Sequence, residues 1–295
     1  MNWSIRCVIL FCAISTILFP AVSVGQSLSE VADFAEEQYK SENFEVAASE
    51  FGRALYFGHS GQDKLFLKVA NCYFNLKDFE QSIVFYDKAY FASQSDSIKN
   101  EAILGKSFSL IVENQWMLAL SELMNIDNAA SDDQKSKMNF LQGIAYFGLH
   151  EDELAESSFK KCLNGLPLNV DFQSIEHEFE SIRKNEKRFN PKTAWALSLI
   201  IPGSGQFYSK EYKEAANSAI LLGGLFYLTV NFATKFSFAE AVLVMLPWFQ
   251  RYYIGGANKA EKFAIEQQLA MRNNSYQAIL ELLETKNFKE SKSIQ

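Results

Sequence analysis

Cysteine is scarce in this chain, which limits the covalent and metal-binding frameworks that it can build. Of four cysteines in 295 residues, Cys7 and Cys12 lie in the first 26 residues, leaving Cys72 and Cys162 for the rest. These two are ninety residues apart, and neither belongs to a Cys-x-x-Cys pair or to a Cys/His spacing typical of zinc. Each falls on an apolar helical face, so the pattern favours buried free thiols, with a disulfide as the alternative.

Histidine is equally rare, and no arrangement of residues suggests catalysis. His177 lies between glutamates in IEHEFE, but the motif is not HExxH, so an exposed helix face is the preferred interpretation over a metal site. The sequence shows no nucleophile paired with a base, and the segment PGSGQ lacks the lysine and spacing of a phosphate-binding loop. We therefore predict no catalytic residue, no metal and no cofactor.

Positive charge is sparse in the first half of the chain. Residues 27–167 contain 22 acidic and 12 basic residues, whereas residues 168–295 contain 13 acidic and 15 basic ones. Binding to a phosphate backbone requires clustered lysine and arginine that displace counterions. Nucleic acid is consequently not an expected partner.

The N-terminus has the layout of a secretory signal peptide, predicted over residues 1–26. Arg6 precedes an apolar run from Cys7 to Phe19, and small residues follow before Gln26. The alternative is an uncleaved anchor helix, although a run of this length is short for a full membrane span.

Residues 27–167 contain four superimposable segments of helical character. Small residues recur at spacings of 35, 37 and 36, and a large apolar residue follows each of them four positions later. The small positions are Ala47, Ser82, Ala119 and Ala155, and the large ones are Phe51, Tyr86, Leu123 and Phe159. Each helical pair cannot bury its apolar face alone, so the pattern predicts a stacked solenoid with a concave face.

These segments resemble the tetratricopeptide repeat, most clearly in repeats one, two and four. The third repeat departs from the pattern, with Trp116 at its turn, and we expect irregular helix ends there. The resemblance implies a groove that binds an extended or helical peptide of another protein. Its predicted residues are Tyr39, Leu67, Asn71, Phe74, Phe108, Lys137, Phe140 and Ile144. The alternative is that most of these side chains only pack between repeats.

A capping or linker helix is predicted over residues 168–190, before the chain becomes strongly apolar. Val170, Phe172, Ile175, Phe179 and Ile182 recur at helical spacing. This helix would close the solenoid and lead to a membrane domain.

The predicted membrane domain covers residues 191–256. Its opening apolar segment is too short to cross a bilayer and ends in a Pro-Gly-Ser-Gly break. Residues 215–234 are free of charge and long enough to span, and residues 236–255, with Glu240 and Pro247, predict a weaker returning span. A transmembrane helical hairpin is therefore expected.

Residues 190–264 resemble an uncharacterised membrane-domain family of Bacteroidota, through PGSGQFY and the later RYYIGGANKAEKFA. The resemblance supports an integral membrane domain and implies no reaction. The motif residues are Pro202, Gly203, Gly205, Gln206 and Tyr208. Because glycine and proline usually mark backbone geometry, a structural helix break is favoured over a binding site.

Residues 257–295 predict an amphipathic C-terminal helix and tail, with Phe263, Leu269, Tyr276, Ile279 and Leu283 among polar residues. The fold expected for the whole chain is all-α. The preferred function is a non-enzymatic scaffold in the cell envelope, anchored in the inner membrane with the repeats facing the periplasm, which contacts lipid and binds a protein or peptide partner. The alternative is an accessory subunit of an envelope transport or enzyme complex, with a small site or conduit at PGSGQ.

Overall fold

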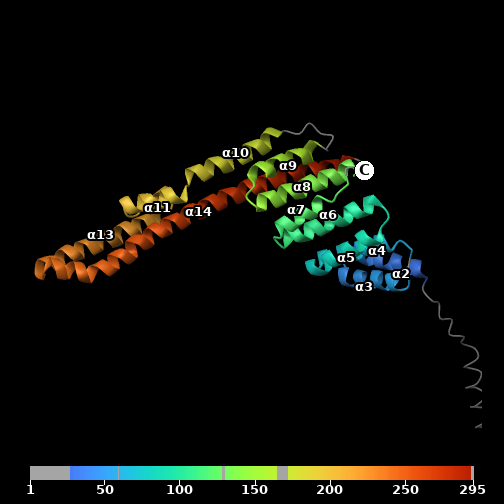
Figure 1. Cartoon of the computed structure of the whole chain (residues 1–295), viewed down its shortest axis with the longest axis horizontal. Coiled ribbons are helices and arrows are strands. Elements are labelled where there is room, and N and C mark those ends of the chain that lie inside the picture. The colour runs from blue at the N-terminus through green and yellow to red at the C-terminus, as the bar shows by residue number, and fades with distance from the viewer. Residues whose placement is uncertain (1–26, 59, 128–129, 165–171, 294–295) are drawn as a thin grey trace, which may run out of the picture. The chain divides into compact units, whose positions relative to one another are not determined.

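The computed structural model describes residues 27–58, 60–127, 130–164 and 172–293, and all regular elements in this part of the chain are helices (Figure 1). The all-α prediction is thereby confirmed. The chain divides into two compact units between Glu151 and Asp152, so the second helix of the predicted fourth repeat is grouped with the second unit. The predicted signal peptide lies outside the described residues.

The first unit is built from helices that follow one another in antiparallel pairs (Figure 1). Each helix packs against its neighbours in sequence, and α4 also contacts α6, as does α8. The helices are α2 (Leu28–Lys40), α3 (Phe44–Tyr56), α4 (Gln62–Asn75), α5 (Phe79–Ala92), α6 (Asp96–Val112), α7 (Trp116–Leu123) and α8 (Asp132–Gly148).

The small and large residues that recur in the sequence repeats are buried where the helices pack together. The four small residues Ala47, Ser82, Ala119 and Ala155 are fully buried, and the four large residues Phe51, Tyr86, Leu123 and Phe159 are at most 5% exposed. A small side chain lets two helices approach, and the large side chain one turn later fills the space beside it. The predicted periodic core is confirmed.

The first helix of each repeat ends in the same backbone conformation. One residue in each turn has a positive φ of about 60°, and the following amide donates to the carbonyl five residues earlier, at 2.8–2.9 Å. The four left-handed residues are Glu42, Lys77, Asn114 and His150. This is the geometry that stops a helix and reverses the chain, and it recurs at the same spacing as the buried small residues.

The third repeat is irregular, as expected. Its first helix, α6, has 17 residues and its second, α7, has eight. Gly105 on α6 lies against the ring of Tyr86, where a Cβ atom would come within 2.2 Å of the ring. The absence of a side chain at this position therefore admits the Tyr86 ring.

The second unit consists of helices arranged around one long helix, α14 (Figure 1). Helices α10, α11, α12 and α13 each contact α14. The helices are α9 (Asp152–Asn164), α10 (Phe172–Arg188), α11 (Pro191–Ile200), α12 (Ser204–Tyr208), α13 (Tyr212–Lys235) and α14 (Phe238–Ser293). The predicted linker helix corresponds to α10, which buries Ile175, Phe179 and Ile182.

The prediction of a separate amphipathic helix after residue 256 was wrong. Helix α14 runs without interruption for 56 residues, and Gly255 and Gly256 lie inside it. Its buried residues recur on one face as Ala257, Ala260, Ala264, Arg272, Ser275, Ile279 and Leu283. Leu269, predicted on the apolar face, is 45% exposed. Small residues that allow close helix packing, rather than large apolar ones, define most of this face.

The predicted pair of transmembrane helices is not borne out by the described residues. Helices α13 and α14 lie side by side after a tight connection at Phe236 and Ser237, but within the described residues only α13 is long and apolar enough to cross a membrane. In the expected returning span, Glu240 forms a capping box with Ser237, and Arg251 closes the apolar run at the other end. The stretch between these two charges is too short for a full span.

Candidate functional site

A pocket of about 560 Å³ lies on the first unit, between α4, α5, α6 and α8. We call it the repeat groove. It is lined by Lys64, Leu67, Lys68, Asn71, Tyr86, Ser97, Ile98, Glu101, Leu104, Gly105 and Lys137. Three of the predicted site residues, Leu67, Asn71 and Lys137, are brought together here from two different repeats.

Tyr86 and Asn71 both line the repeat groove. The Tyr86 hydroxyl donates a hydrogen bond to Asn71 Oδ1 at 2.6 Å, and burial of the ring raises the pKa of Tyr86 above its usual value. The Oδ1 atom of Asn71 therefore already accepts a hydrogen bond, and the Nδ2 atom of the same side chain can donate one to a ligand. The sequence identified Tyr86 only as a core residue, because the close approach of Gly105 that places it at the groove is not visible in a periodic pattern.

Lysines outnumber acidic residues in the lining of the repeat groove, although the unit as a whole is acidic. Lys68 is paired with Glu36 at 3.0 Å and Lys137 with Asp133 at 2.7 Å. Lys64 has no ion-pair partner among the described residues, and Glu101 is the one acidic residue that lines the pocket. The groove can therefore attract an acidic group while offering Leu67 and its apolar neighbours for contact.

The other predicted groove residues lie elsewhere. Phe74 stacks on Phe108 with ring centroids 4.9 Å apart, and Phe108 remains 41% exposed. Tyr39 packs edge-on against Phe44 in the first-repeat core, while Phe140 and Ile144 pack against the core of the third repeat. For these residues the alternative of packing within the repeats describes the structure better.

The glycines of the membrane motif are required by close backbone contacts. Gly203 has a φ of 92°, and a Cβ atom there would lie 2.5 Å from the Ala215 carbonyl oxygen. A Cβ atom on Gly205 would lie 1.9 Å from the Ala194 carbonyl oxygen, so α11 and α12 meet at backbone distance. Pro202 precedes them in the turn between these helices.

Gln206 is fully buried and joins four segments of the second unit. Its Nε2 atom donates to the Gly256 carbonyl at 2.8 Å and to Ser218 Oγ at 3.2 Å, while its Oε1 atom accepts from Ser198 Oγ at 3.0 Å. The Ser198 hydroxyl also accepts from the Gly205 amide at 3.1 Å. Because the side-chain amide is fully used by protein partners, the motif has the properties of a helix junction.

Tyr208 also contributes to this helix junction. Its hydroxyl accepts a hydrogen bond from the Asn190 amide at 3.0 Å, and its ring packs against Ala194, Ala260 and Ala264. The motif residues therefore hold the start of α11 and the middle of α14 together.

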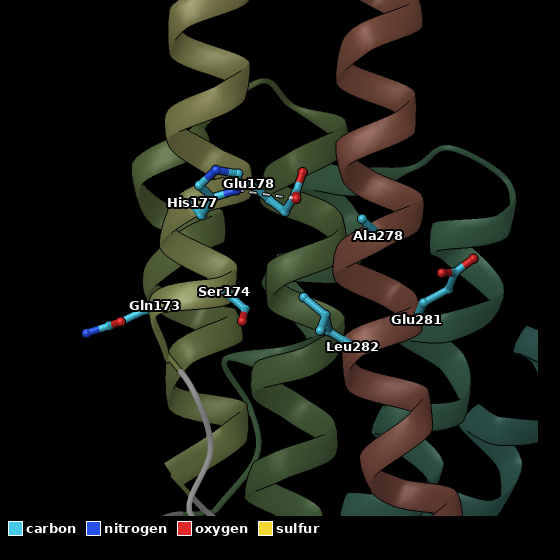
Figure 2. Close-up of a pocket in the computed structure, with 7 residues that line it drawn as sticks. All are labelled: Gln173, Ser174, His177, Glu178, Ala278, Glu281 and Leu282. Atoms are coloured by element: carbon cyan, nitrogen blue, oxygen red, sulfur yellow. Dashed lines mark ion pairs between the residues drawn. The ribbon is translucent and has the colours of Figure 1, made fainter.

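A further hollow, between α10 and α14, contains His177 (Figure 2). Figure 2 shows Gln173 extending away from this hollow and His177 beside Glu178, with 3.7 Å between His177 Nδ1 and Glu178 Oε1. The side chain of His177 is 77% exposed, and the described residues contain no group of three potential metal ligands. The hollow offers no chemistry beyond a polar surface.

Comparison with known proteins gives little. No protein-family model matches the chain, and no curated protein matches it. Among solved structures, one described as "MamA RS-1 ArsTM double mutant" is similar with a TM-score of 0.46 and 18% identity, covering 55% of this chain and 87% of that one. A likeness at this level supports no inference about function, which must be argued from the chain's own geometry.

Proposed function

We propose that this protein is a membrane-anchored scaffold of tetratricopeptide type, acting in the cell envelope, whose repeat groove binds a segment of a partner protein. The observation that carries the proposal is the convergence of Leu67, Asn71 and Lys137 on one pocket. Two of these positions belong to one repeat and the third to another, so a bound segment would contact more than one repeat.

The partner's chemistry follows from the groove. The Asn71 Nδ2 atom is suited to donate to a main-chain carbonyl, since its Oδ1 atom is already held by Tyr86. Lys64 supplies a cation without a partner among the described residues, and Leu67 and Leu104 supply apolar contact. A peptide with an acidic side chain next to an apolar one fits these three features.

Support for the membrane anchor comes from the surface of α13. Ile220, Phe226 and Tyr227 are 73%, 63% and 68% exposed, and 11% of the apolar stretch is buried within the protein. Exposed apolar area on this scale costs about 25 cal/mol per Å² in water and is stabilising in lipid. Insertion of α13 in a bilayer accounts for this composition. We place the anchor in the inner membrane and the repeats in the periplasm, on the basis of the signal-like N-terminus.

The test is affinity capture from detergent-solubilised membranes with charge-reversed groove variants. We compare the intact protein with Lys64→Glu/Lys137→Glu, which lines the groove, and with the control Lys88→Glu/Lys135→Glu, which has the same charge change on α5 and α8 outside it. Asn71 is unsuitable for the first test, because its removal also strips the Tyr86 hydroxyl of its acceptor.

We expect one partner to be recovered with the intact protein and the control, and to fall at least tenfold with the groove variant, about 1.4 kcal/mol of binding. Equal recovery with both variants would exclude the repeat groove as the binding surface.

A further inference from the structure

The most apolar of the described hollows lies between α13 and α14, beside the motif junction. It has a volume of about 720 Å³, within the range of small-molecule pockets. Its walls include Leu221 and Leu222 from α13, and the charged residues that line it are Glu214, Arg251 and Lys259. We call it the hairpin pocket. Apolar walls together with charged side chains suit an amphiphile rather than a fully polar ligand.

The charged residues of the lining leave one cation available. Lys259 forms an ion pair with Glu214, so these two charges balance. Arg251 is exposed and has no ion-pair partner among the described residues. A guanidinium group in this position can bind a phosphate through two parallel hydrogen bonds.

The pocket lies beside the N-terminal part of α13, where a charged segment is followed by one without charges. Residues 215–234 contain no charged side chain, and Glu214 directly precedes them. The aromatic ring of Tyr252, which lines the pocket, stacks on Trp248 with centroids 6.2 Å apart. Tyrosine, tryptophan and arginine together are typical of the zone where lipid headgroups meet acyl chains.

The membrane motif shapes the inner wall of the pocket. Ser218 and Gly256 line it, and both are held by hydrogen bonds from the buried Gln206 amide. Gly255 lies in the wall with nothing within 4 Å of an added Cβ atom, so the wall is open at this point. The junction at PGSGQ therefore fixes the separation of α13 and α14 around the hollow.

We propose that the hairpin pocket binds one anionic phospholipid, with its phosphate on Arg251 and the beginning of an acyl chain against Leu221 and Leu222. The proposal rests on the membrane anchoring proposed above. It assigns the motif a supporting role, since Gln206 holds the walls and does not touch the lipid.

The experiment is native mass spectrometry of the full-length protein purified in mild detergent and supplied with either phosphatidylglycerol or phosphatidylcholine of identical chains. Two variants alter the pocket: Arg251→Gln removes the free cation, and Gly255→Leu fills the hollow. Two matched controls do not: Lys262→Gln removes an exposed cation of α14 outside the lining, and Gly223→Leu adds the same side chain to α13 where a Cβ atom also has open space.

We expect one phosphatidylglycerol to remain bound to the intact protein and both controls, with about tenfold preference over phosphatidylcholine. Gly255→Leu should lose the bound lipid, and Arg251→Gln should lose the preference. Equal binding of both lipids to the intact protein, or unchanged binding to Gly255→Leu, would overturn the proposal. Displacement of the lipid by glycerol phosphate alone would also overturn it, because the acyl chain would then contribute nothing.

Failure of the anchor can be told apart from failure of the lipid site. Alkaline carbonate extraction of membranes shows whether the protein is integral to them. A protein that is extracted contradicts the anchoring proposal, whereas one that resists extraction but shows no lipid preference contradicts the pocket alone.

Discussion

At the scale of single residues, the second unit depends on backbone contacts that no side chain can tolerate. Gly205 is the tightest of these, because the Ala194 carbonyl oxygen occupies the place of its Cβ atom. The neighbour is main chain and cannot rotate away, so any larger residue must push α11 and α12 apart.

We therefore expect Gly205→Ala to destabilise the second unit by about 2–4 kcal/mol through overpacking and loss of the Gln206 network. Thermal unfolding in detergent, followed by circular dichroism, measures this as a lowered midpoint. Gly223→Ala is the control, since a Cβ atom there meets nothing within 4 Å and alanine favours a helix. A variant at position 205 as stable as the control would contradict the junction.

The buried thiol of Cys72 gives the first unit a dependence on alkaline pH. Burial raises the pKa of Cys72 from 9.0 to about 12, so the folded state favours the neutral thiol. Between these values the unfolded chain binds fewer protons than the folded one, and stability falls as pH rises from about 9 towards 12.

Urea unfolding at a series of pH values should show this decline, and Cys72→Ala should have a shallower slope even though its overall stability is lower. Tyr39 and Tyr86, whose pKa values are also raised by burial, keep part of the slope in the variant. Identical slopes for the two proteins would show that Cys72 does not contribute. Cys72 and Cys162 are buried and are not joined in a disulfide, in agreement with the preferred prediction.

At the scale of elements, α14 is held to α9 by a nearly buried ion pair. Arg272 and Asp152 are 7% and 15% exposed, with 2.7 Å between Arg272 Nη1 and Asp152 Oδ1. Removal of one partner leaves a buried charge, whereas replacement of both removes the desolvation cost as well.

We expect Arg272→Met to lower the stability of the second unit by about 3–5 kcal/mol, and Asp152→Ala/Arg272→Met to lower it by clearly less than the sum of the two single changes. A double-mutant cycle measured by denaturant unfolding provides the test. Additive effects of the two changes would mean that the pair contributes nothing specific.

Sequence periodicity predicted the repeats well because a solenoid uses the same contact in each unit. Ala47 and its equivalents are buried where expected, and their spacing equals that of the left-handed turn residues. Lys210, between α12 and α13, adopts the same turn: its φ is 65°, and the next amide bonds to the Gln206 carbonyl at 2.8 Å. The PGSGQ stretch thus ends like the first helix of a repeat, which the sequence comparison of repeats did not reach.

Two features escaped prediction for physical reasons. The predicted returning span ended at residue 255, but the packing of Ala257, Ala260 and Ala264 against the junction carries α14 beyond it. Three of the eight residues predicted to line a groove, Tyr39, Phe140 and Ile144, pack against cores instead, because a periodic pattern cannot distinguish a concave face from an interface between neighbouring helices.

At the scale of the whole molecule, the chain combines an acidic repeat unit with a second unit in which most of the apolar stretch of α13 is exposed within the described residues. Under the proposed function, the exposed face of α13 anchors the molecule in a membrane, and the repeat groove binds its partner. We expect a variant to alter one of these properties without the other.

Phe226→Lys places a charge near the middle of α13, which costs about 3 kcal/mol in the centre of a bilayer. We expect this variant to be released from membranes by alkaline carbonate, while Phe91→Lys is retained. Phe91 is 79% exposed on the first unit and serves as the matched control. Retention of the α13 variant would show that α13 does not cross the membrane.

Trp116 and Trp248 lie in different environments, so the fluorescence of each can report on a different unit. Trp116 is packed between the third and fourth repeats' helices, where Gly148 leaves room for its ring, whereas Trp248 is half exposed on the apolar part of α14. In vesicles of brominated lipid, fluorescence from a variant retaining Trp248 alone should be quenched, and fluorescence from one retaining Trp116 alone should not. The two emissions would then report separately on lipid contact and on the folding of the repeats.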